Sequence, residues 1–153
     1  MDEVDSIFIR VTEVGPRDGL QNESVAIPTA DKVQLVDALS KAGFSEIEVS
    51  SFVNPRWVPQ LADASEVFAG IARRKGTKYS ALVPNEKGLE RAIASGVGKV
   101  SVFTAATESF TLKNINTTIE ESIQRFRPVV DSAFAHGLPV RAYVSCIVEC
   151  PYE

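Results

Sequence analysis

The chain has 153 residues, of which 44% are hydrophobic and 24% are charged, and its formal net charge is −4. This composition is typical of a globular domain with a hydrophobic core, and the scattered basic residues argue against a nucleic-acid-binding surface. No apolar run approaches the roughly 18 residues of a membrane span. The start, Met1 to Asp5, resembles neither a secretory signal nor a transit peptide, and two cysteines make no disulfide framework. We therefore expect a cytoplasmic protein.

Predicted strands and helices alternate along the chain. The β-branched and aromatic run 7–14 predicts a strand that ends at Gly15, and Pro28 begins a helix that ends at Gly43. Further strands are expected at 46–49, 78–83, 99–105 and 139–145, with helices at 62–74 and 86–95 and from residue 117 onward. The sequence thus predicts five strands and four helices in strict alternation.

The last of these helices has a recognisable start. Thr117 and Glu120 have the spacing of a capping box, in which a hydroxyl and a carboxylate satisfy the free amides of the first turn. Pro128 lies inside the helix and is expected to kink it. The predicted apolar face consists of Ile119, Ile123, Phe126 and Val130.

Alternation of this kind indicates an α/β fold, with a parallel sheet and helical crossovers. Two architectures fit: an open doubly wound sheet and part of a (βα)8 TIM barrel. The loop Gly15–Gly19 matches neither phosphate-binding glycine motif of the open sheets. Polar residues follow the predicted strands at 17–18, 48, 84–85, 105–108 and 145, as expected at the active-site end of a barrel.

The barrel interpretation sets the domain organisation. A complete barrel needs about 250 residues. We therefore expect residues 1–153 to be a single domain, the N-terminal part of a catalytic TIM barrel whose C-terminal strands are absent.

Arg17 and Asp18 are the first candidates for chemistry. Adjacent side chains at a strand end should diverge, so that one reaches a metal and the other a substrate oxygen. A carboxylate suits Mg²⁺ or Mn²⁺, and a guanidinium suits a reaction that builds negative charge on a carbonyl oxygen. Spacing alone favours a simpler alternative, an exposed ion pair in a turn, because Asp18-Gly19 is a common turn signal.

Glu48 ends a strand that is buried in a parallel barrel, so its carboxylate needs a partner, and Arg17 is the natural one. A structural ion pair and a catalytic role are compatible here, because an acid can orient a catalytic arginine.

Three other features have mainly structural interpretations. His136, the only histidine, is expected at a helix end away from the site. Cys146 and Cys150 are expected to be loop thiols near the active-site mouth, because no second pair completes a zinc site. The segment 52–59, with Phe52 and Trp57, is expected to be a rigid loop that packs on the barrel or contacts substrate.

Taken together, these residues resemble the hydroxymethylglutaryl-CoA lyase family of the metal-dependent lyase and Claisen-condensation barrels. The resemblance rests on residues 13–23 (EVGPRDGLQNE), 51–60 (SFVNPRWVPQ), 84–85 (PN), 113–116 (KNIN) and 143–153 (YVSC to CPYE). Leu20 separates the chain from the related isopropylmalate and homocitrate synthases, which usually have glutamate there.

The resemblance implies a C–C lyase that cleaves 3-hydroxy-3-methylglutaryl-CoA to acetoacetate and acetyl-CoA, as in leucine degradation. Asp18 would be a ligand of Mg²⁺ or Mn²⁺, and Arg17 would stabilise the enolate of the departing acetyl-CoA. Glu48 would hold the site together beside Arg17, and Gln21 would join Arg17 in binding substrate. The partner would be a small acyl-CoA molecule, with no nucleic acid or membrane, and the protein would be a homo-oligomer.

The chain departs from the family by its length. The family's paired histidine ligands, its asparagine ligand and its catalytic cysteine all lie on later segments, and neither Cys146 nor Cys150 matches that cysteine. Two alternatives therefore stay open beside the lyase. One is a related aldolase or acyl-CoA condensing synthase. The other is a catalytically inactive barrel fragment, whose unpaired sheet edges would favour association with a partner chain or a second copy.

Overall fold

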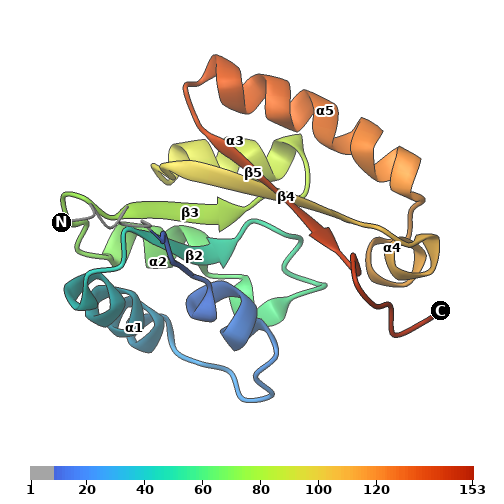
Figure 1. The fold of residues 1–153 in the computed structure, drawn as a ribbon. Coiled ribbons are helices and arrows are strands. Elements are labelled where there is room, and N and C mark those ends of the chain that lie inside the picture. Colours follow the sequence, from blue (N-terminus) through green and yellow to red (C-terminus); the bar gives the residue numbers. More distant parts are fainter. Residues whose placement is uncertain (1–8) are drawn as a thin grey trace, which may run out of the picture.

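A computed structural model describes residues 9–153 and shows one five-stranded sheet (Figure 1). Its strands are β1 (Thr12–Glu13), β2 (Glu46–Ser51), β3 (Lys78–Leu82), β4 (Lys99–Ala105) and β5 (Val140–Ser145). Each strand pairs in parallel with the next one along the chain. Of the strand predicted at 7–14, Ile7 and Phe8 lie outside the described residues.

Five α-helices occupy the connections between these strands. They are α1 (Thr29–Ala42), α2 (Ala64–Gly70), α3 (Glu86–Ala94), α4 (Glu108–Ile115) and α5 (Ile119–Ala135), with a π-helical turn, η1 (Gly15–Gly19), and a 3₁₀ turn, η2 (Pro59–Leu61). The predicted alternation is confirmed, and the crossover from β4 to β5 contains two helices instead of one.

The strand order distinguishes between the two candidate architectures. An open doubly wound sheet reverses its strand order at a switch point, whereas the order here is β1-β2-β3-β4-β5 without reversal. The sheet also curls, since Arg141 Nη2 of β5 donates a hydrogen bond of 3.0 Å to Thr12 Oγ1 of β1 although three strands separate them. This curled half-barrel confirms the prediction of a partial TIM barrel.

The two faces of the sheet have different chemistry because side chains alternate along each strand. On β2, Ile47 and Val49 join the hydrophobic core with Val100 and Val102 of β4. The helices cover this face with Val36 of α1, Val67 and Phe68 of α2, Leu89 of α3, and Phe126, Val129 and Ala133 of α5. The intervening residues of the same strands are polar and line the concave face, where the candidate site lies.

Helix α2 is shorter than the predicted 62–74, and the prediction of its C-terminal end was wrong. Ile71 is extended, with ψ of 141°. The amide of Ala72 donates to Asp37 Oδ1 of α1 at 2.9 Å, so the chain is held by a neighbouring helix instead of continuing its own. Gly70, the last residue of α2, packs closely on α1, since a Cβ at this position would lie 2.9 Å from the Val33 side chain.

Helix α5 begins one residue later than predicted. Its capping box joins Thr118 and Glu121, in place of the predicted Thr117 and Glu120. The helix continues through Pro128. Its buried face also differs from the prediction, since Ser122, Phe126, Val129 and Ala133 are buried whereas Ile123 is 45% exposed.

Candidate active site

Glu48 is the centre of the polar cluster on the concave face. Its side chain is fully buried, and both carboxylate oxygens accept hydrogen bonds. Oε1 accepts from Arg17 Nε at 2.6 Å, and Oε2 accepts from Ser101 Oγ at 2.7 Å and from Tyr143 Oη at 3.0 Å. Side chains from β2, β4, β5 and the turn after β1 therefore meet at one carboxylate, and the predicted pairing of Glu48 with Arg17 is confirmed.

Arg17 links this buried carboxylate to the surface. Its side chain is only 12% exposed, and its Nη1 donates to Asp18 Oδ1 at 2.6 Å, whereas the Asp18 side chain is 58% exposed. The expectation that these adjacent side chains diverge was wrong. A guanidinium has enough donors to pair with two carboxylates at once, and here it bridges an interior acid and an exposed acid.

The backbone of η1 sets the position of both residues. The amides of Arg17 and Asp18 donate to the carbonyl of Val14 at 3.1 and 2.7 Å, so the chain turns immediately after β1. Gly15 donates its amide to Glu13 Oε1 at 2.6 Å, and a Cβ at Gly15 would lie 2.8 Å from that oxygen. A larger residue at this position would therefore displace the Glu13 carboxylate from its contact with the turn.

Tyr143 and Ser101 belong to the site but carry no local sequence signal that would have identified them. Burial and the negative charge of Glu48 raise the pKa of the Tyr143 phenol, although its hydrogen bond with Arg141 opposes this shift. The phenol therefore stays protonated and serves as a donor to Glu48. The Arg17 guanidinium carbon lies 5.9 Å from the Tyr143 ring centroid, which adds a cation–π contact.

A second polar layer lies one step toward the N-terminal ends of the strands. Glu46 has Lys99 Nζ at 3.0 Å and Arg141 Nη1 at 2.9 Å. Its Oε2 accepts a hydrogen bond from Lys99, whereas its buried Oε1 has ion-pair contacts without a hydrogen bond in residues 9–153. The concave face thus carries two layers of charged side chains, and Arg17 and Glu48 lie in the layer nearer the C-terminal ends of the strands.

The donor set for a metal is incomplete in this part of the chain. Within residues 9–153, no three His, Cys, Asp or Glu side chains are grouped so that they could hold a metal ion. The exposed Asp18 carboxylate fits as one hard oxygen ligand, and only its Oδ1 is hydrogen-bonded to Arg17. Gln21 follows η1 and is half-buried.

The remaining candidates lie where the structure gives them other roles. His136 caps the C-terminus of α5, as expected, with Nδ1 2.8 Å from the Ser132 carbonyl. Phe52 is a core residue that stacks on Phe68, whereas Trp57 is 74% exposed.

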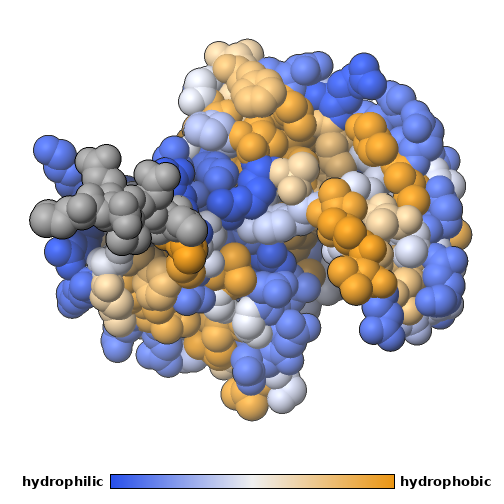
Figure 2. All heavy atoms as spheres, in the orientation of Figure 1, coloured by the Kyte–Doolittle hydropathy of each residue, from blue (hydrophilic) through white to orange (hydrophobic). Residues whose placement is uncertain are grey.

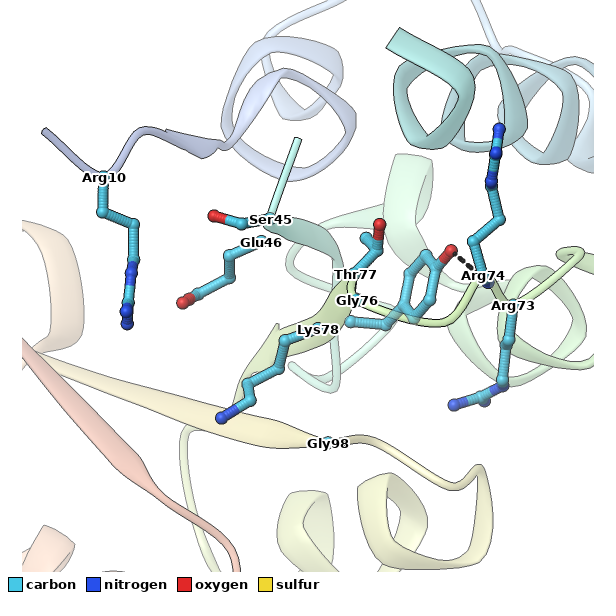
Figure 3. Close-up of a pocket in the computed structure, with 10 residues that line it drawn as sticks. Arg10, Ser45, Glu46, Arg73, Arg74, Gly76, Thr77, Lys78 and Gly98 are labelled. Atoms are coloured by element: carbon cyan, nitrogen blue, oxygen red, sulfur yellow. Dashed lines mark hydrogen bonds between the residues drawn. The ribbon is translucent and has the colours of Figure 1, made fainter. Parts of the chain in front are cut away.

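A cavity of about 630 Å³ lies at the opposite ends of the strands and does not include this site. Its lining includes Glu46 and Lys78, the first residues of β2 and β3, together with Arg10. Figure 3 shows these three side chains extending toward a common space. Active sites of barrel enzymes lie at the C-terminal strand ends, so we place the candidate site at Arg17 and Asp18, which follow β1. Their buried partner Glu48 lies inside β2, and the prediction that it ends this strand was wrong, because β2 continues to Ser51.

Among residues 9–153, no helix combines the length and the apolarity that crossing a membrane would require.

Comparison with known proteins extends over nearly the whole chain. A lyase from Pseudomonas aeruginosa named 3-hydroxy-3-isohexenylglutaryl-CoA/hydroxy-methylglutaryl-CoA lyase is 56% identical over 95% of this chain and 48% of its own length. The mitochondrial hydroxymethylglutaryl-CoA lyase of Gallus gallus is 54% identical over 95% of this chain and 49% of its own. The chain therefore spans about half the length of the curated relatives it matches.

Solved structures agree with the fold. The HMG-CoA lyase of Brucella melitensis has a TM-score of 0.95 at 52% identity, and the match covers 97% of this chain and 52% of that one. An HMG-CoA lyase from Acinetobacter baumannii in complex with coenzyme A and 3-methylmalate has a TM-score of 0.89 at 38% identity. This match covers 94% of the present chain and 47% of the Acinetobacter chain. The HMGL-like family model matches residues 8–151. The chain therefore belongs to the HMGL-like family.

Proposed function

We propose that the full-length protein is a divalent-metal-dependent lyase that cleaves 3-hydroxy-3-methylglutaryl-CoA to acetoacetate and acetyl-CoA, and that this chain is the N-terminal part of its catalytic barrel. The observation that carries the proposal is the chain of contacts from buried Glu48 through Arg17 to exposed Asp18. It places a cation and a carboxylate at the strand ends where barrel enzymes bind substrates. The names of the relatives support the substrate.

Asp18 would hold the metal, Mg²⁺ or Mn²⁺, together with ligands from the second half of the protein. When bound, a divalent metal polarises substrate oxygens as a Lewis acid. The carboxylate suits this role because it is 58% exposed and carries hard oxygen donors.

Arg17 would act on the charge that forms during cleavage. A base removes the proton from the tertiary hydroxyl, the carbon–carbon bond breaks, and the electron pair passes to the thioester as an enolate, which an acid then protonates. A preorganised guanidinium beside the enolate oxygen stabilises that charge. Glu48 would fix the orientation of Arg17 through its Nε bond, and Gln21 would contact substrate from the same turn.

The base, the acid and the other metal ligands are expected in the second half of the protein. Since residues 9–153 supply no three-residue metal cluster, we expect the 153-residue chain alone to have no lyase activity. Such a fragment would be the catalytically inactive barrel part considered above.

The test is an assay of the full-length protein with 3-hydroxy-3-methylglutaryl-CoA and Mg²⁺ or Mn²⁺, in which acetoacetate is measured. We expect metal-dependent release, which a chelator abolishes. A parallel screen of short acyl-CoA and keto-acid pairs covers the alternative of a condensing synthase or aldolase. Condensation without acetoacetate release would refute the lyase and favour that alternative.

We further propose that the protein is a cytoplasmic homo-oligomer. Its two cysteines are free thiols, as in a reducing compartment. The large apolar side chains exposed on and near the edge strand β5, among them Ile123, Phe134 and Val144, lie where the second half of the barrel would pack, and any that this half leaves uncovered are available to a second copy. Figure 2 shows hydrophobic residues at the surface beside this part of the fold. Sedimentation of the full-length protein tests the assembly, and a stable monomer at micromolar concentration would contradict it.

A further inference from the structure

The loop after β5 brings two thiols together at the end of the sheet that carries the candidate site. Cys146 directly follows β5, and its φ of 60° is in the left-handed region, which turns the chain back on itself. Cys150 lies four residues later, and the two thiols are close enough to shift each other's pKa. Both cysteines are free.

Cys150 has the surroundings of an ionisable thiol. Thr107, at the start of α4, donates its hydroxyl to Cys150 Sγ at 3.1 Å. Burial opposes ionisation, but this hydrogen bond and those from the backbone of Tyr152 and Glu153 lower the pKa of Cys150. A thiolate is the reactive form of cysteine toward oxidants.

Cys146 is suited to act second. Burial and the neighbouring Cys150 thiol raise the pKa of the Cys146 thiol, so Cys146 keeps its proton more readily than Cys150 does. Cys146 is half-buried and Cys150 is only 9% exposed, whereas the intervening Ile147 and Val148 are 73% and 99% exposed, so the loop between the two thiols is at the surface. A molecule as small as hydrogen peroxide therefore needs only a local movement of this surface loop to reach the Cys150 sulfur, and no unfolding of the barrel.

We propose that Cys146 and Cys150 form an oxidation site, at which a peroxide converts the two thiols into a disulfide that closes the loop after β5. This oxidation site is independent of the lyase activity, since it depends on the spacing of the two thiols, on their proximity and on the contact of Thr107 with Cys150. It assigns these cysteines a role that neither the Arg17 site nor a zinc site gives them.

The chemistry balances in two steps. The Cys150 thiolate attacks hydrogen peroxide, the O–O bond breaks, and with one proton the products are a sulfenic acid and water. The Cys146 thiol then attacks that sulfur, its proton leaves with the hydroxide as water, and the S–S bond forms. The two thiols are oxidised by two electrons in total, and one peroxide is reduced to two waters. A dithiol reductant reverses the change by thiol–disulfide exchange.

The test uses the full-length protein, treated with limiting hydrogen peroxide and analysed by peptide mass mapping after free thiols are alkylated. We expect a peptide pair joined through Cys146 and Cys150, with the loss of two hydrogens, which dithiothreitol restores. With Cys146→Ser, dimedone should trap a sulfenic acid at Cys150. With Cys150→Ser, neither the bridge nor the adduct should form.

A second variant tests the contact that activates Cys150. Thr107→Val removes the hydroxyl donor and should slow bridge formation at neutral pH at least about threefold, because the thiolate fraction falls. Thr77→Val is the matched control, since its hydroxyl donates to the Phe44 carbonyl, away from the loop. Cysteines that stay reduced while methionine oxidises, or that bridge to a cysteine elsewhere instead, would overturn the proposal. An unchanged rate in Thr107→Val would overturn the assigned role of Thr107.

Discussion

Replacing Glu48 with glutamine removes one negative charge while keeping the shape of the side chain. In the native structure the fully buried carboxylate accepts from Arg17, Ser101 and Tyr143. The single carbonyl oxygen of glutamine can replace only one of the two carboxylate oxygens, so it can accept either from Arg17 or from Ser101 and Tyr143. Its amide nitrogen, however, is a donor, and it faces either Arg17 or the hydroxyls of Ser101 and Tyr143, which are donors too. Arg17 is then left nearly buried, with only the exposed Asp18 as a counter-charge.

The expected cost follows from this change in charge. Removing one partner of a buried ion pair costs about 3–5 kcal/mol, because the other charge stays buried without compensation. The contact with Asp18 persists and reduces that penalty. We therefore expect Glu48→Gln to lower the free energy of unfolding by about 3 kcal/mol, at the lower end of this range.

Urea unfolding of the full-length protein, followed by far-ultraviolet circular dichroism, measures this difference. Glu90→Gln is the control, since Glu90 is exposed on α3, and it should change the free energy by less than about 0.5 kcal/mol. A double-mutant cycle with Arg17→Gln isolates the pairwise term. If Glu48→Gln were as stable as the control variant, the buried pair would not be holding the site together.

Three further predictions concern the site and one helix start. Asp18→Asn should weaken Mn²⁺ binding by about tenfold or more in calorimetric titration. Its melting temperature in the presence of a chelator should be unchanged, because the Asp18 side chain is exposed. An Mn²⁺ affinity equal to that of the unmodified protein would remove Asp18 from the ligand set. Arg17→Gln should lower kcat by about 10²- to 10³-fold while substrate still binds, and retained turnover would contradict its role. Hydrogen bonds from the Thr118 backbone and the Thr117 hydroxyl lower the pKa of Glu121. The ionised Glu121 therefore stabilises the folded state at pH values above the usual carboxyl pKa. This stabilisation is lost as the pH falls through the lowered pKa of Glu121 in the folded protein. Glu121→Gln should flatten that acid limb of the stability profile, and an unaltered profile would refute the assignment.

The regular part of the fold was predictable because each strand carries its own local signal. Short runs rich in β-branched and aromatic residues predicted all five strands, two of them with a glycine or proline directly after the run, and the alternation with helices predicted parallel pairing. The strand order itself had to come from the structure, because an open sheet and a barrel both fit the alternation. The helix errors have a different origin. Helix α2 ends early because the Ala72 amide donates its hydrogen bond to Asp37 of α1 and not to a carbonyl of its own helix. No local pattern contains that contact. Helix α4 was missed because its eight residues are too few to show a clear apolar period.

The candidate site divides in the same way. The pairing of Glu48 with Arg17 was predictable, because a buried acid requires a cationic partner and Arg17 follows the neighbouring strand. Ser101 and Tyr143 were not, since a serine and a tyrosine on inner strands have many ordinary uses. They reach Glu48 only because the sheet curls, which also brings Arg141 to Thr12. Curvature is a property of the whole sheet and is invisible in any one segment.

The contact between Arg17 and Asp18 changes what the turn after β1 can do. If the two side chains diverged, metal and substrate would be bound by independent groups. Instead Nη1 of Arg17 occupies one oxygen of the Asp18 carboxylate, and Glu48 holds the other side of the guanidinium. A carboxylate has lone pairs for more than one partner, so a metal bound to Asp18 would be coupled to the orientation of Arg17. In that case Arg17→Gln should alter Mn²⁺ affinity as well as turnover, whereas independent groups would leave the affinity unchanged.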